Sequence, residues 1–154
     1  MIYIASDHAG FELKNKLVGY LKSKGHEVED MGANEYDEND DYPDIIYPCA
    51  LRVAESQAQG KLDDVGIVIG GSGQGEAIVA NKVKGIRAAV YYGGNLEIVK
   101  RSRDHNNANI LSLGARFLTY DEAKEAVDLW LTTKFENPER HVRRIEKIKK
   151  IESS

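Results

Sequence analysis

The chain has little of several features that would point to particular protein classes. One cysteine, Cys49, among 154 residues excludes an internal disulfide framework and is typical of a reducing compartment, so we expect a cytoplasmic protein. No apolar run is long enough to span a bilayer, and a strand pattern at the N-terminus leaves no room for a signal peptide. The net charge of −4 argues against general binding of nucleic acid or membrane surfaces.

Short apolar runs alternate with stretches of helical period, which is the pattern of a parallel sheet wrapped by helices. The predicted strands are 2–5, a short one near 28, 65–70, 86–91 and 109–113. The predicted helices are 10–24, one opened by Pro43 and disturbed in its first turns by Pro48, one ending at 82, then 96–102, 121–134 and 138–151. We therefore predict one domain, 1–154, with a three-layer, doubly wound, Rossmann-like α/β fold around five parallel strands.

A glycine-rich loop, GGSGQGE at 70–76, directly follows the third predicted strand. Open parallel sheets bind ligands at the carboxyl ends of their strands. Glycines there allow several backbone N–H groups to face a ligand, which suits a phosphate or the oxyanion of an enediolate. The loop is not a Walker A motif, because no Gly-Lys-Ser/Thr follows, and it is irregular as a dinucleotide fingerprint. A tight turn without a ligand is the alternative interpretation.

Acidic and imidazole side chains lie near this loop and near the last strand. Glu76 ends the loop, where a carboxylate can remove a proton next to a carbonyl or simply stabilise the start of a helix. Asp7 and His8 follow the first strand, and Asp7 can orient His8, bond a sugar hydroxyl or cap the first helix. His105 and Asn106 precede the last strand, where a plain loop is the default interpretation.

Three arginines are candidates for holding a phosphate. Arg116 follows the last strand, at the ligand-binding edge of the sheet. Arg140 and Arg144 are four residues apart, so they share a helix face that either binds phosphate or faces solvent. Cys49 is expected to be a buried structural thiol. No spacing of Cys, His and carboxylates predicts a metal site.

Taken together, these residues resemble the ribose-5-phosphate isomerase B family, which also includes galactose-6-phosphate and allose-6-phosphate isomerases. The resemblance covers 2 to about 148 and depends on the order and spacing of SDHAGF at 6–11, LK at 13–14, DYP at 41–43, GSGQGE at 71–76, ANK at 80–82, GIRA at 85–88, HNNAN at 105–109 and LGAR at 113–116. One departure is Asn107, where the family more often has aspartate.

The resemblance implies interconversion of ribose 5-phosphate and ribulose 5-phosphate through an enediolate, with no metal or organic cofactor. In one branch of the family the base is a cysteine at the position of Gly70. This chain resembles the other branch, so Glu76 is the implied base and His105 the acid that opens the sugar ring. The implied substrate contacts are Asp7 and His8 for the ring or hydroxyls, Gly71, Ser72, Gly73, Gln74, Gly75 and Asn106 for the enediolate oxygen, and Arg116, Arg140 and Arg144 for the phosphate.

The position of His105 before the last strand conflicts with a site inside one chain. His105 lies at the end of the sheet opposite the glycine-rich loop and the segment with Asp7 and His8. Arg140 and Arg144 lie on a C-terminal helix with no obvious route back to that end. We therefore expect a partner subunit, in the dimers or tetramers that the resemblance implies, to complete each site, with the helix at about 138–151 reaching across.

Three other functions fit parts of the sequence. A hexose phosphate isomerase, acting on allose or galactose 6-phosphate, keeps the same chemistry. A nucleotide or phosphate sensor on the same fold would use the glycine loop but needs neither Glu76 nor His105. A nicotinamide-dependent oxidoreductase fits least well, because the loop follows the wrong strand. The sequence leaves the preferred sugar open.

Overall fold

The computed structural model describes residues 1–154 and contains a single sheet of five parallel strands. The strands are β1 (Ile2–Ser6), β2 (Val28–Asp30), β3 (Val65–Gly70), β4 (Ala88–Tyr91) and β5 (Ile110–Gly114). Their order across the sheet is β2-β1-β3-β5-β4. The predicted doubly wound α/β fold is confirmed, although β4 begins at Ala88 rather than at residue 86.

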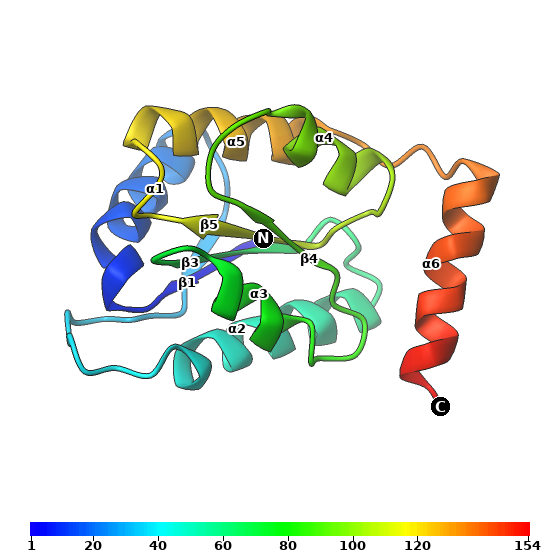
Figure 1. Cartoon of the computed structure of the whole chain (residues 1–154), viewed down its shortest axis with the longest axis horizontal. Coiled ribbons are helices and arrows are strands. Elements are labelled where there is room, and N and C mark those ends of the chain that lie inside the picture. The colour runs from blue at the N-terminus through cyan, green and yellow to red at the C-terminus, as the bar shows by residue number, and fades with distance from the viewer.

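Helices cover both faces of the sheet, and the last helix stands apart from it (Figure 1). After a 3-10 turn, η1 (His8–Gly10), the helices are α1 (Phe11–Ser23), α2 (Tyr42–Ala58), α3 (Gln74–Ala80), α4 (Glu97–Asp104), α5 (Tyr120–Thr132) and α6 (Glu139–Glu152). Helices α1, α4 and α5 lie on one face, and α2 and α3 lie on the other. No helix is long and apolar enough to cross a membrane.

Each face of the sheet has its own hydrophobic core. On one face Leu17 of α1 and Trp130 of α5 are fully buried against the strands. On the other face Val53 of α2 packs with Val68 of β3. Strand β3 is buried at every position, as its continuous apolar run predicts for a central parallel strand. Burial of such side chains contributes roughly 1.5–3 kcal/mol each and fixes β3 as the platform for the loop that follows it.

The expectation that Pro48 disturbs α2 is wrong, because the helix runs without interruption from Tyr42 to Ala58. Pro48 has no N–H for the carbonyl of Asp44, but both residues are exposed, so water can bond this carbonyl. Ile46 and Cys49, both fully buried, anchor the same turns to the sheet. Burial also raises the pKa of the Cys49 thiol to about 12, as expected for a structural cysteine.

Candidate active site

The carboxyl ends of three adjacent strands bring the predicted ligand loops together. β3 lies between β1 and β5, with Ser6 paired to Ile69 and Gly70 paired to Gly114. The segments after Ser6, Gly70 and Gly114 therefore emerge side by side at one edge of the sheet. They carry Asp7 and the glycine loop, with Arg116 beside them.

Glu76 folds back over the end of β3. A Cβ atom placed on Gly70 would lie 1.9 Å from Oε1 of Glu76, so only glycine at this position leaves room for the carboxylate. The Glu76 side chain belongs to the first turn of α3 and the residue is 4% exposed. Burial raises the pKa of this carboxyl above its ordinary value, and the nearby Asp7 raises it further.

Asp7 lies next to Glu76 and is itself buried. Its Oδ1 accepts the N–H of Gly10 at 3.2 Å, and its own N–H donates to the carbonyl of Ile69 at 3.3 Å. These bonds hold the Asp7 carboxylate near Glu76, where its negative charge acts on the Glu76 carboxyl. A negative charge so close to a second carboxyl disfavours its ionisation, which is the direction of the pKa shift of Glu76.

The glycine loop is tied to β5 while its own N–H groups stay free. The carbonyls of Gly70 and Gly71 accept backbone N–H groups of the β5–α5 loop at 2.8 and 3.0 Å. The hydroxyl of Ser112 donates to the carbonyl of Gly73. The backbone of Gly73 has a φ of 78°, in the left-handed region that favours glycine. The N–H groups of Gly71, Ser72 and Gly73 have no acceptor in the chain. Fixed donors beside a carboxylate can stabilise an oxyanion that forms when the carboxylate takes a proton.

Arg116 is the only predicted phosphate-binding arginine at this edge. A Cβ atom on Gly71 would lie 3.2 Å from its Nη1, so the guanidinium rests on the glycine loop. The side chain is exposed and close enough to His8 to disfavour protonation of that imidazole. Arg116 can therefore hold an anionic group at the rim of the site.

His8 is held by Asp40, a residue that the sequence analysis did not single out. Nδ1 of His8 lies 2.6 Å from Oδ1 of Asp40, and the His8 N–H donates to the same oxygen at 3.3 Å. The hydrogen bond to Asp40 raises the pKa of His8 above its ordinary value. The ligand atoms of Asp7, His8 and Asp40 all lie within 4.8 Å of one another, but this Asp40 oxygen already serves His8, so we assign the trio to hydrogen bonding.

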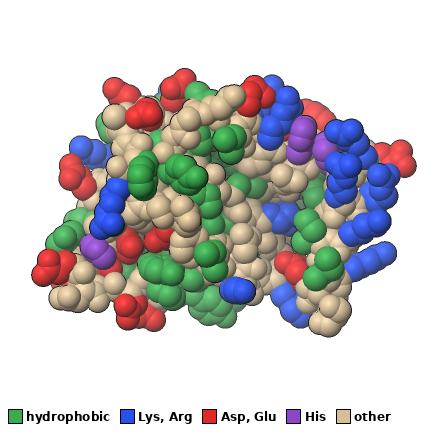
Figure 2. All heavy atoms as spheres, in the orientation of Figure 1, with side chains coloured by type: hydrophobic (Ala, Val, Ile, Leu, Met, Phe, Trp, Pro, Cys, Tyr) green, Lys and Arg blue, Asp and Glu red, His purple; other side chains and the backbone are tan.

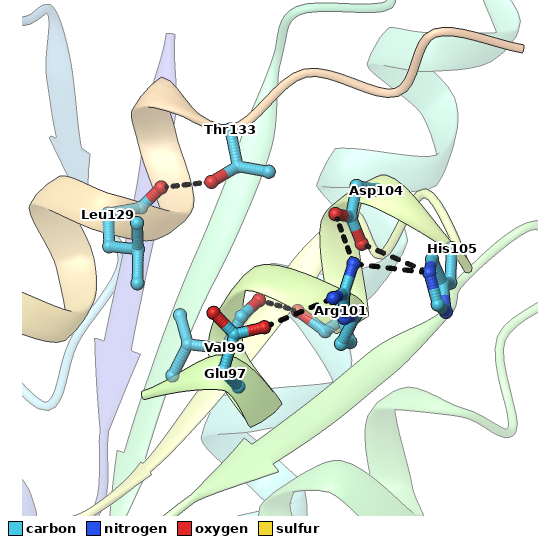
Figure 3. A network of polar contacts seen from close by, with 8 residues as sticks. Glu97, Val99, Arg101, Asp104, His105, Leu129 and Thr133 are labelled. Carbon is cyan, nitrogen blue, oxygen red and sulfur yellow. Dashed lines mark hydrogen bonds and ion pairs between the residues drawn. The ribbon is translucent and has the colours of Figure 1, made fainter. Parts of the chain in front are cut away.

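His105 lies at the other end of the sheet, as the sequence predicts. β5 begins with Ile110 in register with Gly66, at the start of β3, whereas Glu76 follows the end of β3. His105 stacks on His141 of α6 with 4.3 Å between ring centroids. Its Nε2 lies 3.4 Å from Nη1 of Arg101 and 3.8 Å from the Asp104 carboxylate (Figure 3). His105 and Glu76 therefore do not meet within one chain.

A second polar cavity surrounds His105. Its volume is about 490 Å³, and its lining residues are Asp104, His105, Glu136, Pro138, Glu139, Arg140, His141 and Arg143. Lys and Arg side chains gather over this end of the molecule, along α6 (Figure 2). Burial, followed by the charges of His105 and Arg140, lowers the pKa of His141. Arg140 and Arg143 face this cavity together, beside the carboxylates of Asp104, Glu136 and Glu139.

The structure divides the predicted site residues into two groups. Asp7, His8, the glycine loop, Glu76 and Arg116 lie together, and His105 lies with Arg140 in the distant cavity. Two predicted residues join neither group. Asn106 is exposed, and its carbonyl accepts a hydrogen bond from Nε of Arg87 at 3.2 Å. Arg144 does not line the cavity around His105, where Arg143 accompanies Arg140 instead. Sequence spacing carries no signal for Asp40 or His141, whose contacts exist only in the fold.

Known proteins are similar to this chain in both sequence and fold. The family model of the ribose/galactose isomerases matches residues 2–148. Ribose-5-phosphate isomerase B from Mycolicibacterium paratuberculosis is 43% identical over 145 residues, which is 94% of this chain and 87% of that protein. The crystal structure of ribose-5-phosphate isomerase B from Mycoplasma genitalium with bound ribulose-5-phosphate has a TM-score of 0.91 and 42% identity, covering 99% of this chain and 96% of the other. The structure of ribose-5-phosphate isomerase B from Clostridium thermocellum has a TM-score of 0.86 and 46% identity, covering 99% of this chain and 97% of the other. The chain therefore belongs to the ribose/galactose isomerase family.

Proposed function

We propose that this protein is an aldose–ketose isomerase that interconverts ribose 5-phosphate and ribulose 5-phosphate. The observation that carries the proposal is the buried carboxylate of Glu76 beside the free N–H groups of Gly71, Ser72 and Gly73. A base next to an oxyanion-binding loop is what proton transfer between adjacent carbons requires. The named relatives support the choice of a pentose phosphate.

In the proposed mechanism Glu76 removes the C2 proton of the open-chain aldose and returns it at C1. The N–H groups of the glycine loop stabilise the negative oxygen of the enediolate between the two steps. Loss of one such donor typically costs about 2.7–4 kcal/mol of transition-state stabilisation. The raised pKa of Glu76 makes its carboxylate a stronger base than an ordinary glutamate. The proposed route uses no metal or organic cofactor.

The sugar is proposed to lie between the strand ends and a second subunit. Asp7 and His8 would contact its ring or hydroxyls, and Arg116 would contact its phosphate. His105, proposed to open the ring, and the arginines of α6 lie too far from Glu76 in the same chain, so a second copy would supply them. In support, α6 stands apart from the sheet and exposes Ile148 (45%) and Ile151 (71%).

The homo-oligomer, a dimer or a tetramer, would then form each site from two chains, with Asn106 and Arg144 also contributed by the partner. The free, buried Cys49 favours the cytoplasmic location that the sequence analysis expects. The protein would need no other macromolecular partner.

The test is an assay of the purified protein with ribose 5-phosphate and with allose 6-phosphate, following ketose formation. We expect turnover of the pentose and its loss in the Glu76→Gln variant. Turnover of the hexose alone would replace the substrate and keep the mechanism. Failure to isomerise either sugar would contradict the proposed function and favour a phosphate-binding sensor.

A further inference from the structure

The contact between His8 and Asp40 joins two distant parts of the chain, 32 residues apart. Asp40 lies near the end of the acidic loop between β2 and α2, in which the residues from 34 to 39 are exposed. One oxygen of Asp40, Oδ1, lies near both nitrogens of His8 that face it, the ring Nδ1 at 2.6 Å and the backbone N–H at 3.3 Å. This arrangement fixes both the position and the rotation of the imidazole ring.

The rest of the surroundings leaves one ring nitrogen of His8 unused. Tyr36, from the same acidic loop, packs edge-on against the ring with 6.2 Å between centroids. The charged groups that face His8 are Asp7 and Asp40, which favour its protonation, and Arg116, which opposes it. Nε2 has no hydrogen-bond partner in the chain, because the only bond of the ring is the one through Nδ1. Nε2 is therefore the atom available to a ligand.

The surroundings of Asp40 do not suit a residue that only anchors the loop. Its second carboxylate oxygen, Oδ2, is buried and has no hydrogen-bond donor in the chain. A buried acceptor without a donor costs stability. A residue that only anchored the loop would therefore be more stable as a neutral or fully hydrogen-bonded side chain. An ionised carboxylate is instead the partner that orients an imidazole for chemistry and stabilises its charged form.

We propose that Asp40 is a positioning residue of the isomerase, which holds His8 so that its Nε2–H donates to an oxygen of the sugar. The inference rests on the proposed function of the site and adds a residue to it. Asp40 itself does not touch the reacting atoms. It acts through His8, by keeping Nδ1 occupied and by stabilising the imidazolium.

The proposal sets the direction of a pH effect. Because the hydrogen bond to Asp40 raises the pKa of His8, the imidazolium persists to higher pH than that of an ordinary histidine. When His8 loses its proton, Nε2 becomes an acceptor and can no longer donate to the sugar. The alkaline decline of kcat/KM therefore follows the titration of His8, and it moves to lower pH when the Asp40 charge is removed.

The experiment combines NMR titration of the histidine rings with pH profiles of kcat/KM for ribose 5-phosphate. The variants are Asp40→Asn, which keeps the shape and removes the charge, and Asp40→Glu, which keeps the charge. The matched control is Glu38→Gln, in the same loop, with the same loss of charge and no hydrogen bond to His8. A His8→Asn variant identifies the His8 signal.

We expect Asp40→Asn to lower the pKa of His8, to move the alkaline decline to lower pH and to reduce kcat/KM at least about tenfold near neutral pH. Asp40→Glu should restore part of this loss, and Glu38→Gln should match the wild type. An unchanged His8 titration, or a changed titration with an unchanged rate profile, would overturn the role of Asp40. Lack of turnover by the wild type would instead overturn the proposed function on which it rests.

Discussion

The carboxylate of Glu76 occupies the space that a side chain on residue 70 would need. The distance of 1.9 Å between an ideal Cβ on Gly70 and Oε1 of Glu76 is far below any van der Waals contact. A base on residue 70 and a base on residue 76 in this position are therefore mutually exclusive. The geometry explains why residue 70 is a glycine in a chain that carries a glutamate at position 76.

Gly70→Ala should displace the proposed base. The added Cβ forces the Glu76 carboxylate away from the end of β3, and a misplacement of about 1 Å can cost 10²-fold in rate. We expect kcat/KM for ribose 5-phosphate to fall about 100-fold. The control is Gly19→Ala in α1, where a Cβ would meet nothing within 4 Å. Wild-type activity in Gly70→Ala would show that the observed position of Glu76 is not needed.

Glu76→Gln should separate activity from stability. Loss of the base is expected to reduce kcat by 10²- to 10⁴-fold. A carboxyl whose pKa is higher in the folded than in the unfolded state loses stability as pH rises through that interval. The neutral amide avoids this loss, so the variant should unfold at a higher urea concentration than the wild type at neutral pH and not at acid pH. A lower urea midpoint at neutral pH would contradict this account.

Asp7→Asn should change the pH profile in a defined direction. Burial is the main cause of the raised pKa of Glu76, and the negative charge of Asp7 adds to it. Without that charge the pKa falls, so the acid-side decline of kcat/KM should move to lower pH even if the maximal rate drops. A pH series with both proteins measures the shift. An acid-side decline of kcat/KM that stays in place or moves to higher pH would argue against an effect of the Asp7 charge on Glu76.

Mixed oligomers can test whether two chains form each site. A heterodimer of Glu76→Gln and His105→Asn subunits, isolated with two affinity tags, would contain one intact site if Glu76 and His105 come from different chains. We expect about half the wild-type kcat per dimer, although each homodimer is inactive.

The matched control pairs a wild-type subunit with a subunit that carries both substitutions. Both of its sites would be damaged if the chains share them, so this heterodimer should be inactive. Half activity in this control, together with an inactive first heterodimer, would mean that each chain forms its own site.

Lys14 offers a test of stability away from the base. Its side chain is 1% exposed, and Nζ lies 2.7 and 2.8 Å from the two carboxylate oxygens of Asp30. Lys14→Ala should lower the free energy of unfolding by about 2–4 kcal/mol, since it leaves a cavity and a carboxylate without its partner. Lys14→Met fills the space and should cost less, because Asp30 is partly exposed. Urea unfolding measures both, and equal losses would contradict the packing argument.

Local pattern and sheet topology account for much of the site. The apolar run 65–70 predicts a buried strand, and parallel strands place the segments that follow them at one edge of the sheet. Asp7, the glycine loop and Arg116 therefore came together as predicted, and His105 fell at the far edge for the same reason. The misjudged Pro48 shows the limit of local rules, because its missing hydrogen bond faces solvent and the buried side of the helix holds the turn.

The sequence by itself determined the fold, the edge at which the ligand loops meet and the types of chemical group placed there, because these depend on periodicity and on strand direction. Only the tertiary structure decided that Glu76 enters the space left by Gly70, that Asp40 reaches His8 and that His105 stacks on His141. Each of these contacts joins side chains whose meeting depends on rotamers and loop paths. Such choices are set by packing and electrostatics across the whole fold, which no spacing along the chain encodes.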